Sequence, residues 1–188
     1  GEPLDNYDNL LTFIRMLTDE NGLHISQRNL TVSTCGLVPR IRDLAKEGLQ
    51  ITLALSLHAS NQEKRLELMP VAKSYDIHEA VDAMQDYFEE TGRRVTFEYS
   101  LVAGVNDTEE DARELAELIH GINCHVNLIP VNPIKERDFV QPDGKSVQEL
   151  KINLKNAELN VTIEEEMGRD IEWRMRTVAQ TVLERQDS

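Results

Sequence analysis

The chain has 188 residues, of which 40% are hydrophobic, 9 are glycine and 6 are proline. This composition is sufficient for a packed core in one domain, or in one domain and part of a second, and it excludes collagen-like and low-complexity classes. The formal net charge of −14 repels polyanions, so we expect weak or no RNA binding by the isolated chain.

Two cysteines, Cys35 and Cys124, are too few for a disulfide framework and favour a reducing, cytoplasmic location. No run reaches the roughly 18 apolar residues of a membrane span. No basic segment leads into an apolar one as in a signal peptide, so we expect no membrane association. The chain begins with Gly1 rather than Met, and we therefore expect it to start inside a longer reading frame.

Apolar spacing alternates between helical and strand-like segments along the chain. In chain order, the predicted elements are a helix at 10–17, a strand at 29–33, a helix at 39–47, a strand at 51–57, a helix at 77–88, a strand at 95–101, a helix at 107–119, a strand at 124–129, a helix from 146 and a strand at 161–163. Asp107 is the predicted N-cap of the fourth helix, with Glu110 at its third position, and Ser146 is predicted to open the fifth.

Strands separated by helices of this length indicate βαβ units, so the predicted fold class is α/β with parallel strands. No repeat, low-complexity tract or Gly/Ser linker marks a domain boundary before about residue 171. In parallel α/β folds, ligands bind at the carboxyl ends of the strands.

Several predicted strands terminate in polar residues or are followed by them: Ser33, Ser56, His58, Glu98 and Asn132. Each has an ordinary alternative explanation. Ser33 is a common helix cap, His58 a common hydrogen-bonded loop residue, and Asn132 a common turn residue before proline. Glu98 could face solvent on an edge strand. Their convergence on one rim of the sheet nevertheless favours a polar cofactor pocket.

Other combinations of residues do not match a known catalytic, metal-binding or nucleotide-binding motif. Ser33, His58 and Asp111 form a triad only on paper, because no nucleophile elbow is present. The five histidines and two cysteines show no zinc-site spacing, and no dinucleotide-binding or P-loop motif occurs. An aldolase-like barrel enzyme remains an alternative, with Lys46 or Lys73 as the Schiff-base candidate, although neither lies on a predicted strand.

Eight blocks in chain order resemble one family: Gly1-Glu2-Pro3, Ser33-Thr34-Cys35-Gly36, Ser56-Leu57-His58, Arg65-x-x-Leu68-Met69-Pro70, Phe97-Glu98-Tyr99, Gly104-Val105-Asn106-Asp107, Asn127-Leu128-Ile129-Pro130-x-Asn132 and Gly168-Arg169-Asp170-Ile171. The family consists of the radical S-adenosylmethionine (SAM) enzymes that methylate C2 of an adenine in 23S ribosomal RNA and in transfer RNA. The resemblance covers the chain from its first residue to residue 171.

The resemblance implies a partial (β/α)6 barrel over residues 1–171, with SAM and a [4Fe-4S] cluster as the family's cofactors. The family residues that contact SAM carry over to seven positions: Gly1, Glu2, Ser33, Ser56, Leu57, His58 and Asn132. A carboxylate suits the methionyl ammonium, and hydroxyl, imidazole and amide groups suit the remaining zwitterion and the ribose. The family's partners are 23S rRNA and tRNA.

Two departures from the family set limits on this chain. The Cys-x-x-x-Cys-x-x-Cys motif that holds the cluster lies upstream of Gly-Glu-Pro in the family, together with the first two barrel strands and an N-terminal domain. None of these is present here, so we expect no cluster and no turnover from this polypeptide. Glu164 and Glu165 also stand where the family has arginines, which weakens the expectation of an RNA contact.

The second departure is the tail at 172–188. After Gly-Arg-Asp-Ile the family carries a cysteine that accepts a methyl group, and this chain reads Glu172-Trp173-Arg174-Met175 instead. Deleting one base from the Glu172 codon restores codons that permit the family motif, so we interpret the tail as frameshifted. An unrelated amphipathic helix with Val178 and Val182 on one side is the alternative.

The sequence therefore predicts a C-terminal portion of a radical SAM adenine-C2 RNA methyltransferase, inactive by itself. A noncatalytic, pseudogene-like fragment that serves as a binding piece is the alternative from another functional class. Both interpretations place the carrier cysteine and the cluster ligands outside this sequence.

Overall fold

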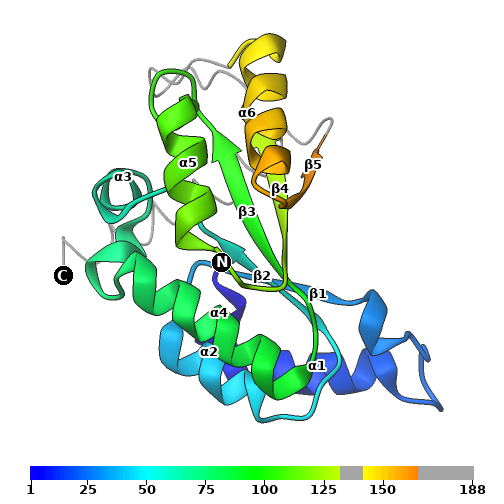
Figure 1. The fold of residues 1–188 in the computed structure, drawn as a ribbon. Coiled ribbons are helices and arrows are strands. Elements are labelled where there is room, and N and C mark those ends of the chain that lie inside the picture. Colours follow the sequence, from blue (N-terminus) through cyan, green and yellow to red (C-terminus); the bar gives the residue numbers. More distant parts are fainter. Residues whose placement is uncertain (132–141, 165–188) are drawn as a thin grey trace.

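The structure, a computed structural model, describes residues 1–131 and 142–164 (Figure 1). Its helices and strands, in order, are α1 (Tyr7–Thr18), β1 (Thr31–Thr34), α2 (Val38–Ala45), β2 (Thr52–Ser56), α3 (Gln62–Leu68), α4 (Ile77–Thr91), β3 (Val95–Leu101), α5 (Glu109–Leu118), β4 (Cys124–Pro130), α6 (Gly144–Asn156) and β5 (Asn160–Ile163). Short 3-10 turns η1 (Pro3–Asn6), η2 (Gln27–Asn29) and η3 (Pro70–Lys73) join them.

The five strands form one parallel sheet in the order β1-β2-β3-β4-β5. The predicted α/β class and parallel pairing are confirmed. Because each strand is added beside its predecessor, the sheet follows the wall of a barrel, but it does not close. Strands β1 and β5 are its edges (Figure 1).

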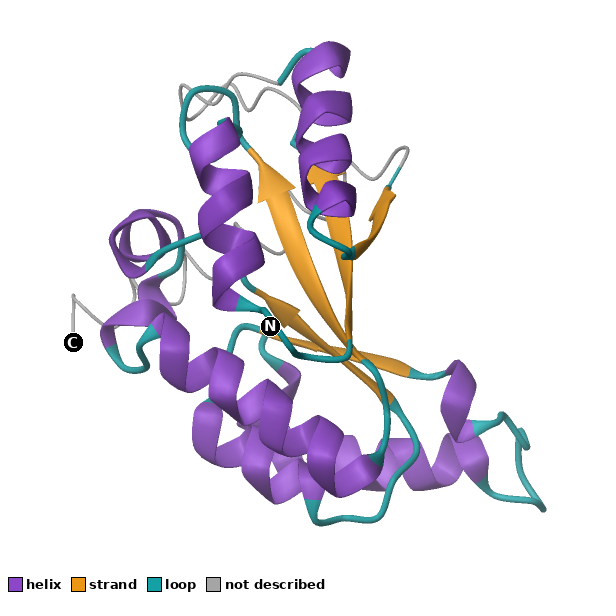
Figure 2. Ribbon diagram, in the orientation of Figure 1, coloured by secondary structure: helices purple, strands orange, loops and turns teal. Residues whose placement is uncertain are grey.

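The two faces of the sheet differ in chemistry because side chains alternate along each strand. One face packs against the helices, which lie together on one side of the sheet in Figure 2, and contributes apolar residues to a single core. Within the described ranges, the opposite face carries Thr31, Ser33, Thr52, Ser56, Thr96, Glu98, His125, Asn127, Asn160 and Thr162. Parallel sheets covered on both faces are apolar on both. A polar second face is what the interior of an incomplete barrel presents.

Two predicted helix starts are wrong by a few residues. The N-cap of α5 is Thr108, which forms a capping box with Asp111, and not Asp107. Asp107 instead accepts a hydrogen bond from the backbone N–H of Gly104 at 2.9 Å in the preceding turn. Helix α6 is capped by Asp143, whose carboxylate accepts from the N–H of Ser146 at 2.6 Å. In both cases the competing side chain has the better backbone position for the cap.

Helix α3 was not predicted, because seven residues are too few to show an apolar period. Asn61 caps it by accepting from the N–H of Lys64 at 2.9 Å. The helix directly follows the loop after β2, and it places Arg65 in the core. In the described part of the chain, no helix combines the length and apolar character needed to cross a bilayer.

Candidate cofactor-binding site

Three adjacent strands bring together two serines and a glutamate on the polar face. Ser33 lies on β1, Ser56 at the end of β2, and Glu98 on β3, where the strand register pairs it with Ser56. The hydroxyls of Ser33 and Ser56 donate to the same oxygen of Glu98, Oε2, at 2.8 and 3.0 Å. The structure thus assembles the predicted convergence of polar strand-end residues around a carboxylate.

Glu98 is one of the polar residues predicted to converge on one rim of the sheet. The alternative, that it faces solvent on an edge strand, is wrong, since β3 is the central strand of the sheet and Glu98 is half-buried. The signal that could have found it is the period-two pattern of β3, which puts Glu98 on the opposite face from Phe97 and Tyr99. The position of Glu98 on the central strand depends on the strand order, which the sequence did not predict.

His58 adjoins this cluster through the backbone. Its ring Nδ1 accepts from the N–H of Ser100 at 2.9 Å, so the proton of the neutral imidazole lies on Nε2. Its backbone is left-handed, with φ at +59°, a conformation that is costly for a residue with a Cβ. Buried Asn106 supports it, since its amide donates to the His58 carbonyl at 2.9 Å and to the Ser100 carbonyl at 2.7 Å.

Leu57 lies between Ser56 and His58 with its side chain fully buried in the core. Its backbone N–H donates to the carbonyl of Glu98 at 3.0 Å, and that of His58 donates to the same carbonyl at 3.2 Å. Strand pairing therefore continues past the end of β2. A contact from Leu57 to a cofactor would have to use its carbonyl.

Glu2 is held at the end of β1 by its own chain. Its carboxylate accepts from the hydroxyl of Thr34 at 2.8 Å, from the N–H of Cys35 at 2.7 Å and from the N–H of Leu4 at 3.0 Å. Thr34 and Ser33 are neighbours on one strand and point to opposite faces. Glu2 thus anchors the N-terminal segment, while Gly1 beside it is exposed. Their predicted roles in holding the methionyl group stay predictions.

The remaining predicted site residue, Asn132, lies outside the described residues, as do Glu165 and the whole tail at 172–188. The predicted boundary between residues 171 and 172 lies there too.

Arg65 fixes the turn after β1 from the core side. The residue is fully buried, and its Nη2 donates to the carbonyl of Cys35 at 2.8 Å. Burial lowers the pKa of this guanidinium from its usual value, and its Nε and Nη1 have no hydrogen-bond partner in the part of the chain that the structure describes. Gly36, with φ at +109°, lies so close that a Cβ there would stand 3.1 Å from Nη2. Sequence reasoning missed this support because α3 gave no signal.

A second, fully buried polar group fixes the loop after β2. Asp111 on α5 accepts from Lys64, from the Thr108 hydroxyl at 2.6 Å and from the Ser60 hydroxyl at 2.8 Å. The Ser60 oxygen also lies 2.8 Å from Oε2 of Glu114. Burial raises the pKa of Asp111, but the hydrogen bonds from Lys64, Thr108 and Ser60 outweigh it and hold the pKa below its usual value. The loop that carries His58 is thereby tied to α5.

Across β4 and β5 the polar face continues as a hydrogen-bonded row. His125 Nε2 lies 2.7 Å from the hydroxyl of Thr162, that hydroxyl donates to Asn127 at 3.2 Å, and Asn127 donates to Glu164 at 2.9 Å. Burial, and then Arg94, lower the pKa of His125, which favours its neutral ring at pH 7. Glu164 is thus a partner of Asn127 in this structure.

Neither cysteine is in the thiolate form that metal binding requires. Burial, and then Glu2, raise the pKa of Cys35 well above its usual value, and burial raises that of Cys124 to about 11. Both are therefore thiols at neutral pH, whereas a metal ligand must be a thiolate. Over residues 1–131 and 142–164, no group of three potential metal ligands occurs. The residues that the structure describes do not fit an iron-sulfur cluster.

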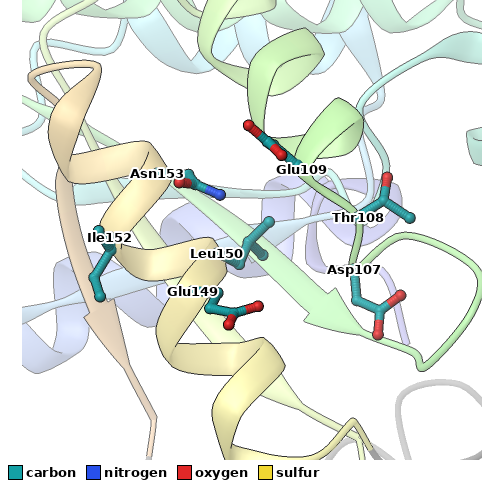
Figure 3. Close-up of a pocket in the computed structure, with 7 residues that line it drawn as sticks. All are labelled: Asp107, Thr108, Glu109, Glu149, Leu150, Ile152 and Asn153. Atoms are coloured by element: carbon teal, nitrogen blue, oxygen red, sulfur yellow. The ribbon is translucent and has the colours of Figure 1, made fainter.

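A separate cavity of about 280 Å³ lies between the start of α5 and α6 (Figure 3). Its lining is Asp107, Thr108, Glu109, Glu149, Leu150, Ile152 and Asn153. Three carboxylates make it unsuited to phosphate groups. It shares no residue with the Ser33–Ser56–Glu98 cluster.

A parallel sheet with polar groups gathered at the carboxyl ends of adjacent strands is typical of α/β proteins that hold a nucleotide-derived cofactor at that edge. Residues 1–119 match the family described as the Radical SAM superfamily, and the chain belongs to this superfamily. SAM and a [4Fe-4S] cluster are the cofactors that this membership implies.

Curated relatives make the likeness more specific. A protein of Lachnoclostridium phytofermentans named probable dual-specificity RNA methyltransferase RlmN is 60% identical over 171 residues, which are 91% of this chain and 48% of that protein. A relative of the same name from Lachnospira eligens is 59% identical over 92% of this chain and 49% of its own length. The chain therefore spans about half the length of the curated relatives that it matches.

Solved structures agree with the fold. A radical SAM methyltransferase from Sphaerobacter thermophilus aligns with a TM-score of 0.87 and 44% identity, over 91% of this chain and 50% of that one. A domain of a pyruvate-formate lyase-activating enzyme from Bacteroides vulgatus has a TM-score of 0.67, over 88% of this chain and 95% of that one. It is only 16% identical, so it supports the fold alone.

Proposed function

We propose that this chain is a cofactor-binding portion of a radical SAM RNA methyltransferase. The whole enzyme would modify C2 of an adenine in 23S rRNA and in tRNA, in the cytoplasm. The observation that carries the proposal is the Ser33–Ser56–Glu98 cluster with His58 beside it, formed at the carboxyl ends of β1 and β2 and in the middle of the adjacent β3. The names of the RNA methyltransferase relatives support the substrate class.

The donor set of the polar edge fits SAM. A carboxylate suits the positive charge of SAM, serine hydroxyls suit the ribose hydroxyls, and an imidazole suits the methionyl carboxylate or the adenine edge. Ser33, Ser56 and Glu98 lie on three adjacent strands and His58 in the loop after β2, so one ligand can contact them all. When bound, SAM supplies the methyl and adenosyl groups of the family's chemistry, and these side chains hold and orient it.

Binding is tested on the 188-residue chain by titrating SAM against its amide NMR spectrum. We expect shifts at the ends of β1, β2 and β3, and none at the cavity between α5 and α6. ATP shares the adenosine but adds a triphosphate, so it should bind much more weakly to this acidic chain. Shifts confined to the cavity, or equal binding of ATP, would contradict the proposed cofactor site.

The Ser56→Ala variant removes one member of the cluster, with Ser146→Ala as a matched control on α6. We expect SAM affinity to fall several-fold for the first, about the loss of one neutral hydrogen bond, and to stay unchanged for the second. Equal affinities for the two variants would remove Ser56 from the proposed site.

We also propose that the 188 residues alone carry out no turnover. The sequence holds two cysteines, both kept as thiols, and three thiolates are needed to hold the cluster that provides the reducing electron. Anaerobic reconstitution with iron and sulfide should leave the protein colourless, and an adenine-containing RNA helix should remain unmethylated. A brown protein that methylates such an RNA would refute the proposal.

The aldolase-like alternative finds no support. Lys46 follows the end of α2 and Lys73 ends η3, so both belong to the helical layer and are exposed. A Schiff-base lysine needs a desolvated position at the site to lower its pKa.

A further inference from the structure

The two serine hydroxyls at the polar edge have a fixed orientation. A hydroxyl has one proton to donate and two lone pairs to accept with. Both Ser33 and Ser56 donate that proton to Oε2 of Glu98, at 2.8 and 3.0 Å. Each serine therefore faces a ligand as an acceptor, and the ligand atom beside it must be a donor.

The same carboxylate determines the electrostatic character of the edge. Two donors converge on one half-buried oxygen, an arrangement that suits a charged carboxylate. Partial burial strengthens its field compared with an exposed carboxylate. Acceptors and negative charge together favour a ligand that is rich in N–H and O–H donors and carries positive charge.

We propose that Glu98 is the specificity-determining residue of the SAM site. It holds both serines as acceptors and selects the cationic sulfonium of SAM over the neutral thioether of S-adenosylhomocysteine. This inference rests on the proposed function, since it concerns the same site. Glu98 is one of the residues that sequence comparison with the family did not assign to cofactor binding.

The unmodified chain provides the first test, by NMR titration with three ligands. SAM and sinefungin, in which an amine replaces the sulfonium, are both cationic at this position, whereas S-adenosylhomocysteine is not. We expect SAM and sinefungin to bind with similar affinity, and the thioether about tenfold more weakly. Equal binding of all three ligands would overturn the inference. Binding of none would overturn the proposed cofactor site as well.

The Glu98→Gln variant keeps the shape and removes the charge. We expect it to lose about tenfold in SAM affinity and less than about threefold in thioether affinity, so that the preference nearly disappears. Glu98→Asp keeps the charge and should retain the preference. Equal losses for both ligands in Glu98→Gln would show a role in folding alone and would overturn the inference.

Glu164→Gln is the matched control. Glu164 lies on the same face, two strands away, with Asn127 as its partner. Its loss changes the net charge as much as the loss of Glu98 does. If Glu164→Gln lowered the preference for SAM as much as Glu98→Gln does, the overall charge of the chain would explain the preference. That result would overturn the assignment to Glu98.

Discussion

At the scale of single residues, Gly36 and Arg65 determine the turn that follows β1. Gly36 has a φ of +109°, and the buried Arg65 holds the carbonyl of the preceding residue. The Thr34 hydroxyl and the Cys35 N–H from the same turn hold the carboxylate of Glu2. Three segments that are distant in sequence therefore meet at a turn in which a Cβ on the glycine would be strained and in close contact with Arg65.

Replacing Gly36 with alanine should destabilise the protein by about 2 kcal/mol, because it adds backbone strain and a close contact. The new Cβ would lie 3.1 Å from Arg65 Nη2 and 3.2 Å from Leu55 Cδ1. Gly48→Ala is the control, since Gly48 has φ at +68° and open space around it, and it should cost about 1 kcal/mol. Urea denaturation compares the two, and equal losses would show that the contact with Arg65 is irrelevant.

Asp111 makes stability depend on pH. Because its pKa in the folded state is below that of an unfolded aspartate, about 3.9, its contribution is fully present above that value. It is lost as the pH falls through the folded pKa. Asp111→Asn should cost about 3 kcal/mol at pH 7, since it leaves Lys64 without its buried partner.

Urea denaturation at several pH values measures this difference. The advantage of the unmodified chain over Asp111→Asn should shrink below about pH 4. A difference that stays constant down to pH 2 would contradict the assigned pKa direction.

Glu98 shows how far residue-level reasoning on the sequence reaches. The alternation of side chains along β3 predicts which face of the sheet Glu98 occupies. The polar residues at the ends of the other strands predict that polar side chains lie near it. Whether β3 is central or at an edge depends on contacts with residues more than 40 positions away, such as Ser56. Strand order is set by global packing, and no local pattern encodes it.

At the scale of elements, helix caps are the least predictable feature. Both Asp107 and Thr108 have N-cap side chains, and each has an acidic residue three positions later. The sequence could not choose between them, because the choice depends on where the turn after β3 delivers the chain. The turn uses Asp107 to accept from Gly104, which leaves Thr108 to cap α5.

Thr108→Ala should therefore cost about 1 kcal/mol, the usual value for a lost N-cap. Asp107→Ala should change stability by no more than about 0.5 kcal/mol, since its hydrogen bond is exposed. The chemical denaturation midpoints of the two variants compare the caps. The reverse order would restore the cap predicted from the sequence.

At the scale of the whole molecule, the described strands form an open sheet and not a closed barrel. The strand types and the parallel pairing follow from alternating apolar periods in the sequence. The polar second face follows from residues such as Thr96 and Asn127, whose side chains have no helix among the described residues to cover them. Over residues 1–131 and 142–164, one face of the sheet is uncovered and β1 and β5 have no further strand beside them, and such open edges are liabilities for a protein on its own.

Heating should reveal this openness. We expect the 188-residue chain to melt over a broad range or to precipitate, because β1 and β5 are edge strands among the described residues and edge strands invite association between molecules. Circular dichroism at several protein concentrations measures the transition. A sharp transition that does not change with concentration would contradict the expectation and show that the open sheet is independently stable.

The order of the strands also bears on how the molecule is made. Each strand lies beside the one synthesised just before it, so every new strand finds its neighbour already formed. Ser33, Ser56 and Glu98 belong to the first three strands, and their hydrogen bonds need nothing beyond residue 98. The Ser33–Ser56–Glu98 cluster can therefore form during synthesis, before the second half of the chain has been translated.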